Sequence, residues 1–150
     1  AIWINKSIVE NAVAELDNSK TNKFFRIRTV ANIFVGELAV CDIEMVDNNF
    51  VYPDGTLICS EKYKLQANET GYEGLIMDFL TKVNHTAVNA GVLPDPMTGK
   101  VGSMDAATVI EAANAMRHTN GSFILTAYAR GDISTAGPVR VRLEVQPVNE

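Results

Sequence analysis

The chain has 150 residues, 47% hydrophobic and 21% charged, which is enough for the core of one ordinary globular domain. Its formal net charge of -5 opposes the attraction to phosphate on which non-specific nucleic-acid binding depends. Two cysteines and two histidines provide neither a disulfide framework nor the ligand spacing of a zinc site. We therefore expect a single globular domain over residues 1–150, with no nucleic-acid partner.

The start of the chain resembles neither a membrane span nor a secretion signal. No apolar run approaches the roughly 20 residues that a membrane-spanning helix needs, and AIWINKS lacks a basic end and a long apolar core. The sequence begins at Ala1 without an initiator methionine and continues with the bulky apolar residues 2–4. We expect a soluble domain excised from a longer protein.

The first third of the sequence predicts one helix followed by a β-hairpin. Residues 7–10 fit a capping box that starts at Ser7, and apolar residues recur at helical spacing as far as Leu16. Alternating apolar and polar residues predict strands over residues 24–34 and 38–46, joined by a turn around Val35.

The remaining sequence predicts further hairpins and two helices. The expected elements are strands at 50–52 and from 57, a helix through 76–87 closing at Gly91, a helix after Ser103, and strands over 122–129 and 139–145. The last strand alternates valine or leucine with charged residues, which is typical of a half-buried antiparallel strand. We expect an α+β fold in which an antiparallel β-sheet of hairpins packs about three helices on one face and is charged on the other.

Arg130-Gly131-Asp132 is the tripeptide that cell-adhesion receptors read, but it falls between the last two predicted strands. A connection is needed at that point, and Gly131 and Gly137 allow backbone dihedral angles that other residues resist. Neither a recognisable signal peptide nor a disulfide framework suggests an extracellular protein. We interpret the tripeptide as a turn rather than a ligand.

Asp42 and Glu44 alternate on the second predicted strand, and two carboxylates placed in this way can hold Mg²⁺. A hairpin that turns on Val35 and pairs inward with inward residues places Arg28 opposite Asp42 and Arg26 opposite Glu44. Carboxylates that already face arginines need no cation. We therefore favour an exposed ion-pair ladder over a metal site.

Three segments of the chain share a pattern with a known family. They are RIRTVANIFVGELAVCDIEMVDNNFVYPDGTLI, VNAGVLPDPMTGKVGS and YARGDISTAGPVRVRLEV. Their most specific pieces are VGE at 35–37, NFVY at 49–52, AGVLP at 90–94 and DI-x-TAGP at 132–138. In their sequence pattern and in their order along the chain, these segments resemble the C-terminal region of the cyanobacterial family called domain of unknown function 3084. The resemblance covers residues 26–145.

The resemblance implies a parent protein with membrane-spanning segments and a long coiled coil, with this domain at its C-terminus on the cytoplasmic side. No catalytic residue is established for that family. We therefore expect a non-enzymatic interaction or assembly domain without a cofactor, which binds a protein partner or associates with itself as a homo-oligomer. The membrane would be reached only through other parts of the parent.

Two other functions remain open from the sequence. The alternative is an RNase H-like, metal-dependent nuclease that holds Mg²⁺ with Asp42, Glu44 and a further carboxylate, either Asp78 or Asp132. A third possibility is a small ligand bound under the loop 91–103, which is long and contains two prolines and three glycines.

Overall fold

The structure is a computed structural model that describes residues 1–31, 33–64, 71–102, 104, 106–119 and 121–148. The chain divides into two compact units, Ala1–Asn49 and Phe50–Glu150. No helix among the described residues is both long enough and apolar enough to cross a membrane.

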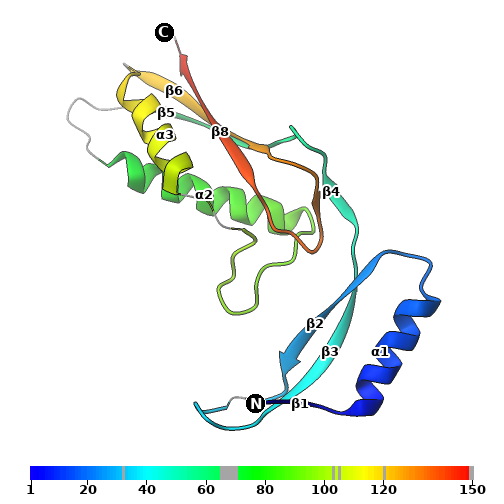
Figure 1. Ribbon diagram of the computed structural model, residues 1–150. Coiled ribbons are helices and arrows are strands. Elements are labelled where there is room, and N and C mark those ends of the chain that lie inside the picture. The colour runs from blue at the N-terminus through cyan, green and yellow to red at the C-terminus, as the bar shows by residue number, and fades with distance from the viewer. Residues whose placement is uncertain (32, 65–70, 103, 105, 120, 149–150) are drawn as a thin grey trace. The chain divides into compact units, whose positions relative to one another are not determined.

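The first unit, blue to cyan in Figure 1, is one helix beside a three-stranded sheet. Its elements are β1 (Ile2–Ile4), α1 (Lys6–Asn18), β2 (Lys23–Thr29) and β3 (Ala39–Asp47). The sheet order is β1-β3-β2, with β1 parallel and β2 antiparallel to β3. The helix α1 contacts β3. The sequence did not predict β1, because three residues are too few for a pattern of alternation.

The ends of two elements differ from the prediction. The helix α1 is capped by Asn5 rather than Ser7, because the Asn5 carboxamide oxygen accepts hydrogen bonds from both the Ser7 amide (3.0 Å) and the Ser7 hydroxyl (2.8 Å). The strand β2 ends at Thr29 rather than at residue 34. The turn itself lies near the predicted position, since the Phe34 amide donates to the Glu37 carboxylate (3.0 Å) and the Glu37 amide donates to the Phe34 carbonyl (3.1 Å).

The second unit holds the larger part of the fold. Its elements are β4 (Phe50–Tyr52), β5 (Leu57–Lys64), α2 (Tyr72–Asn89), α3 (Ala106–Arg117), β6 (Ser122–Ala129), β7 (Ile133–Ser134) and β8 (Val141–Val148). The strands form an antiparallel sheet in the order β5-β6-β8 and a short antiparallel pair β4-β7. The predicted Ser103 cap lies outside the described residues.

The helices α2 and α3 run antiparallel as a hairpin against the sheet (Figure 1). Arg117, in the last turn of α3, reaches the first turn of α2, where its guanidinium lies 3.2 Å from the Glu73 carboxylate and 5.8 Å from the centre of the Tyr72 ring. The α+β class is confirmed. The expected single sheet covered by three helices is corrected, because α1 belongs to the first unit and the strands form three separate sheets.

The core of the second unit is one continuous cluster of buried apolar side chains. Phe79 of α2, Met116 of α3 and Phe123 of β6 are fully buried, and the Phe123 ring stacks on Tyr63 with 5.7 Å between centroids. On the other face of β6, the Arg142 guanidinium lies 5.0 Å from the centre of the Tyr128 ring. Both faces of β6 are therefore covered, and its side chains do not alternate between buried and exposed.

Candidate functional site

The β2–β3 hairpin has the register that the sequence predicted. Arg28 pairs with Asp42 and Arg26 pairs with Glu44 across the two strands. The Arg28 guanidinium lies 3.4 Å from the carboxylate of its diagonal neighbour Glu44, and the Asp42 carboxylate accepts a hydrogen bond from the amide of Ile43 (2.8 Å). Arginine charges thus lie beside both candidate metal ligands.

The nuclease alternative also requires a third carboxylate. Asp42 and Glu44 lie in the first unit, whereas Asp78 and Asp132 lie in the second. Within the described part of the chain, no group of three or more histidine, cysteine, aspartate or glutamate side chains is placed to hold a metal ion. Asp78 is exposed on α2, and Asp132 has a role in a turn.

Arg130-Gly131-Asp132 forms the turn between β6 and β7, as interpreted from the sequence. Gly131 has a φ of 82°, which favours glycine, and its amide donates to the Asp54 carboxylate at 2.6 Å. The Asp132 carboxylate accepts in return from the Asp54 amide at 2.9 Å. The Pro53-Asp54-Gly55 turn and the tripeptide therefore hold each other through two reciprocal hydrogen bonds.

Replacing Asp132 with alanine is expected to lower the free energy of unfolding by about 1 kcal/mol, because the Asp54 amide loses its acceptor. Asp54→Ala should cost a similar amount, and the double variant should cost less than the sum of the two, since the residues stabilise one pair of turns. Urea unfolding followed by circular dichroism measures these values. Asp78→Ala, on the exposed side of α2, is the control, and additive losses would contradict the reciprocal arrangement.

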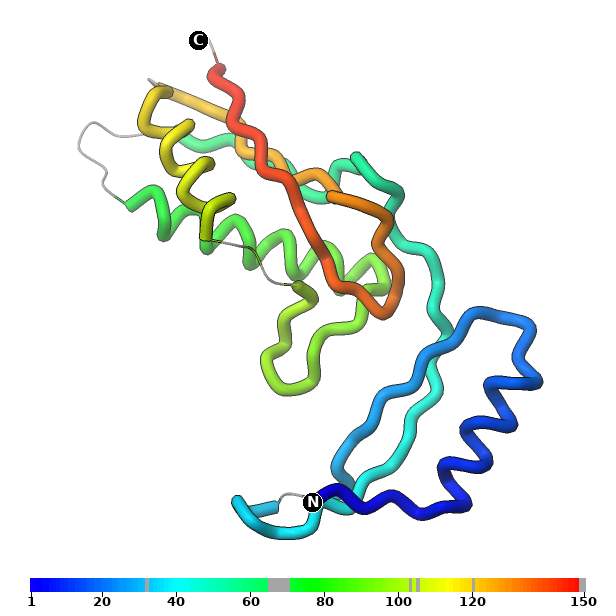
Figure 2. The backbone as a smooth tube through the Cα atoms, viewed as in Figure 1, coloured from blue at the N-terminus to red at the C-terminus, as the bar shows by residue number. Residues whose placement is uncertain are grey.

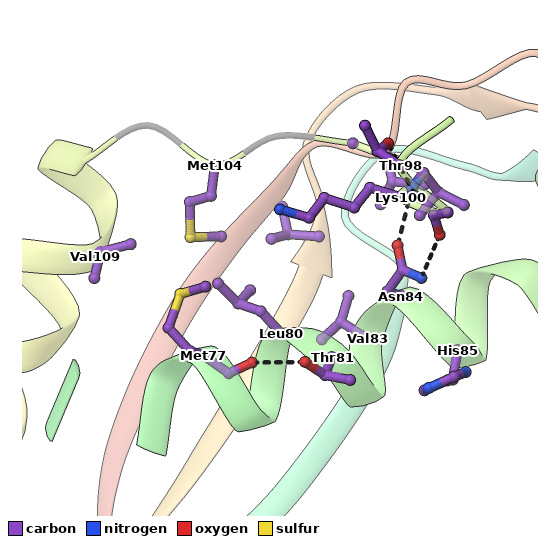
Figure 3. Close-up of a pocket in the computed structure, with 15 residues that line it drawn as sticks. Met77, Leu80, Thr81, Val83, Asn84, His85, Thr98, Lys100, Met104 and Val109 are labelled. Carbon is purple, nitrogen blue, oxygen red and sulfur yellow. Dashed lines mark hydrogen bonds between the residues drawn. The ribbon is translucent and has the colours of Figure 1, made fainter. Parts of the chain in front are cut away.

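A pocket of about 530 Å³ lies under the loop that follows α2 (Figure 3). Its apolar lining comes from α2, the loop, the start of α3 and the approach to β8, with Met77, Leu80, Val83, Val101, Met104, Val109, Val139 and Val141. The polar lining residues are Thr81, Asn84, His85, Thr98 and Lys100. The pocket lies where the sequence suggested a small-ligand site.

Hydrogen bonds hold both ends of the loop that forms one wall of this pocket. The loop runs beside the segment between β7 and β8 (Figure 2), with the Leu93 amide donating to the Thr135 carbonyl (2.9 Å) and the Val139 amide donating to the Val101 carbonyl (2.8 Å). Asn84 of α2 adds two bonds from its carboxamide: it donates to the Gly99 carbonyl (3.2 Å) and accepts from the Val101 amide (2.9 Å).

Gly102 allows the close approach of the two segments. A Cβ added there would collide with the carbonyl oxygen of Val139 and lie 2.9 Å from its carbonyl carbon. The loop also folds on itself, because the Asp95 carboxylate accepts from the amides of Met97 (3.0 Å) and Thr98 (2.8 Å). The pocket wall is therefore preformed.

The surrounding structure accounts for the side chains of His118, Cys41 and Cys59. The ring of His118 lies 2.7 Å from the Asn114 carbonyl at the end of α3, so its Nδ1–H donates there. Cys41 is buried in β3. Burial raises the pKa of the Cys59 thiol on β5, which keeps it protonated at neutral pH.

The comparisons with known proteins concern mainly the second unit. The family model described as the DUF3084-associated C-terminal helical hairpin matches residues 63–149, more than half of the chain. This range contains α2, α3, the pocket wall and the Arg130 turn, but not the β2–β3 hairpin that the sequence resemblance included. No curated protein and no solved structure matches. The chain belongs to the DUF3084-associated C-terminal family, whose function is uncharacterised.

Proposed function

We propose that the chain is a non-enzymatic interaction and assembly domain that binds a protein partner or a second copy of itself through its first unit. The supporting observation is the apolar surface of that unit. Of the described residues 1–49, thirteen large hydrophobic side chains are exposed: Ile2, Trp3, Val9, Val13, Leu16, Phe25, Ile27, Val30, Ile33, Phe34, Val35, Leu38 and Val40. We call these thirteen residues the apolar surface.

The first unit buries little of its own apolar area. Among its described hydrophobic side chains, Ala39 and Cys41 are the buried ones, and α1 contains no buried residue. On the sheet, the register places Phe25 and Ile27 on the same face as Cys41, yet their side chains remain 51% and 52% exposed. A unit of this size is marginally stable unless it gains further burial, and exposed apolar surface of this extent marks interaction sites.

Association through the edge of the sheet is opposed by charge. If two β2 strands paired antiparallel about Ile27, Arg26 of one copy would face Arg28 of the other, and like charges directly opposite each other are destabilising. Charged residues on edge strands commonly prevent this kind of pairing. The apolar side chains of α1 and the sheet face are therefore the favoured contact.

The proposal includes the parent that the sequence resemblance implies, a membrane-anchored coiled-coil protein with this domain on its cytoplasmic side. Coiled coils assemble several chains, so such a parent would hold copies of the domain at high local concentration. Contacts too weak to persist between free domains would then form.

Light scattering over about a hundredfold range of concentration tests the proposal. We expect a mass above that of the monomer at the highest concentrations, and we expect Val13→Lys to shift the association at least about fivefold toward monomer, because an ammonium replaces buried apolar area. Met97→Lys is the matched control, since Met97 is 93% exposed but lies in the second unit. A chain that stays monomeric, with an apolar surface that binds no partner in crosslinking, would refute the proposal.

A further inference from the structure

The pocket under the loop is chemically distinct from the apolar surface and lies wholly in the second unit. Its volume of about 530 Å³ falls within the range of about 300–1,000 Å³ typical of small-molecule sites. Met77 is 54% exposed although it sits on a helix that packs against the core. The pocket therefore leaves apolar area in contact with water that a ligand would cover.

Two methionine side chains stand on opposite sides of the pocket. Figure 3 shows Met77 of α2 and Met104 from the other wall pointing toward each other, with Leu80 near them. Methionine is unbranched and polarizable, so such side chains adapt to the shape of an apolar ligand. This end of the pocket suits a flexible hydrocarbon chain rather than a polar group of a ligand.

The main charge at the pocket is a lysine. Figure 3 shows the Lys100 side chain extending from the loop toward Met104, above the apolar lining. Its ammonium has no ion pair among the described residues, whereas other polar groups of the lining are used: the Thr81 hydroxyl donates to the Met77 carbonyl (3.0 Å), and the Asn84 carboxamide holds the loop. An unpaired ammonium beside apolar surface attracts an anion.

We propose that this pocket binds a small amphipathic monoanion, a free carboxylate on a flexible hydrocarbon chain. The hydrocarbon lies among Met77, Leu80 and Met104, and the carboxylate accepts hydrogen bonds from the Lys100 ammonium. The preformed wall, held by Asn84 and Gly102, reduces the cost of ordering the site when the ligand binds. This inference goes beyond the proposed interaction with a protein, because it concerns a different unit and a different class of ligand.

Decanoate is the probe, kept below its micelle-forming concentration and titrated into the chain labelled with ¹³C at the methionine methyl groups. The chain has five methionines, and their signals can be assigned by single Met→Leu substitutions. We expect the methyl signals of Met77 and Met104 to shift with a common saturating dependence on decanoate. Those of Met45, in β3, and Met116, in the core, should stay unchanged.

The charge is tested with Lys100→Met, which removes the ammonium and keeps the length of the side chain. Binding of decanoate should weaken about fivefold or more, whereas Lys62→Met, on β5 outside the pocket lining, should leave it unchanged. Decanol should bind to the unchanged chain more weakly than decanoate does. The proposal is overturned if neither methionine signal moves, if decanol binds as tightly as decanoate, or if Lys100→Met has no effect.

Discussion

Gly102→Ala is expected to lower the free energy of unfolding by about 3 kcal/mol, near the upper end of the range for overpacking. The added Cβ would collide with the backbone carbonyl of Val139, and backbone cannot swing aside as a flexible side chain can. Relief would require separating the loop from the approach to β8, which would lengthen the bond from the Val139 amide to the Val101 carbonyl, now 2.8 Å. Urea unfolding monitored by circular dichroism measures the loss.

A second glycine substitution provides the control, because it should raise rather than lower the free energy of unfolding. Gly74 lies within α2, and a Cβ added there would meet no atom within 4 Å. Gly74→Ala should therefore raise the free energy of unfolding by about 0.5–1 kcal/mol, because alanine restricts the unfolded chain and favours the helix. If Gly102→Ala were as well tolerated as Gly74→Ala, the close contact between the two segments would be wrong.

Phe123→Ala is expected to cost about 3–5 kcal/mol of the free energy of unfolding. The side chain is fully buried in the core of the second unit and stacks on Tyr63, so its removal leaves a cavity and deprives Tyr63 of a partner. The loss should appear as a lower urea midpoint.

The matched variant is Phe50→Ala, because Phe50 also lies on a strand of the second unit but is 61% exposed. This substitution should change the free energy of unfolding by no more than about 0.5 kcal/mol. Equal losses from the two variants would mean that Phe123 does not lie in the principal core.

Local pattern explains why much of the fold was predictable. The strand β6 was predicted with its observed bounds, and the register of the β2–β3 hairpin followed from the rule that a one-residue slip would turn every side chain to the other face. The turn interpretation of Arg130-Gly131-Asp132 needed only the positions of two glycines and two neighbouring strands.

The features that were missed depend on contacts distant in the sequence. Asn84 stands on a helix like any polar surface residue, and only the folded chain brings the loop carbonyl of Gly99 and the amide of Val101 to its carboxamide. The pairing of β4 with β7 likewise joins residues about 80 positions apart through two short segments. The pocket could be located at the loop from its composition, but its methionines and Lys100 could not be assigned to one site.

The reciprocal bonds between Asp54 and Asp132 limit what adhesion experiments on this chain could mean. A common control replaces the aspartate of the tripeptide with glutamate and attributes any lost attachment to a lost receptor contact. In this chain the Asp132 carboxylate accepts the Asp54 amide, so the longer side chain would disturb the turn itself. A synthetic peptide copied from residues 128–138 would lack Asp54 altogether, and its shape would therefore report nothing about how the protein presents these residues.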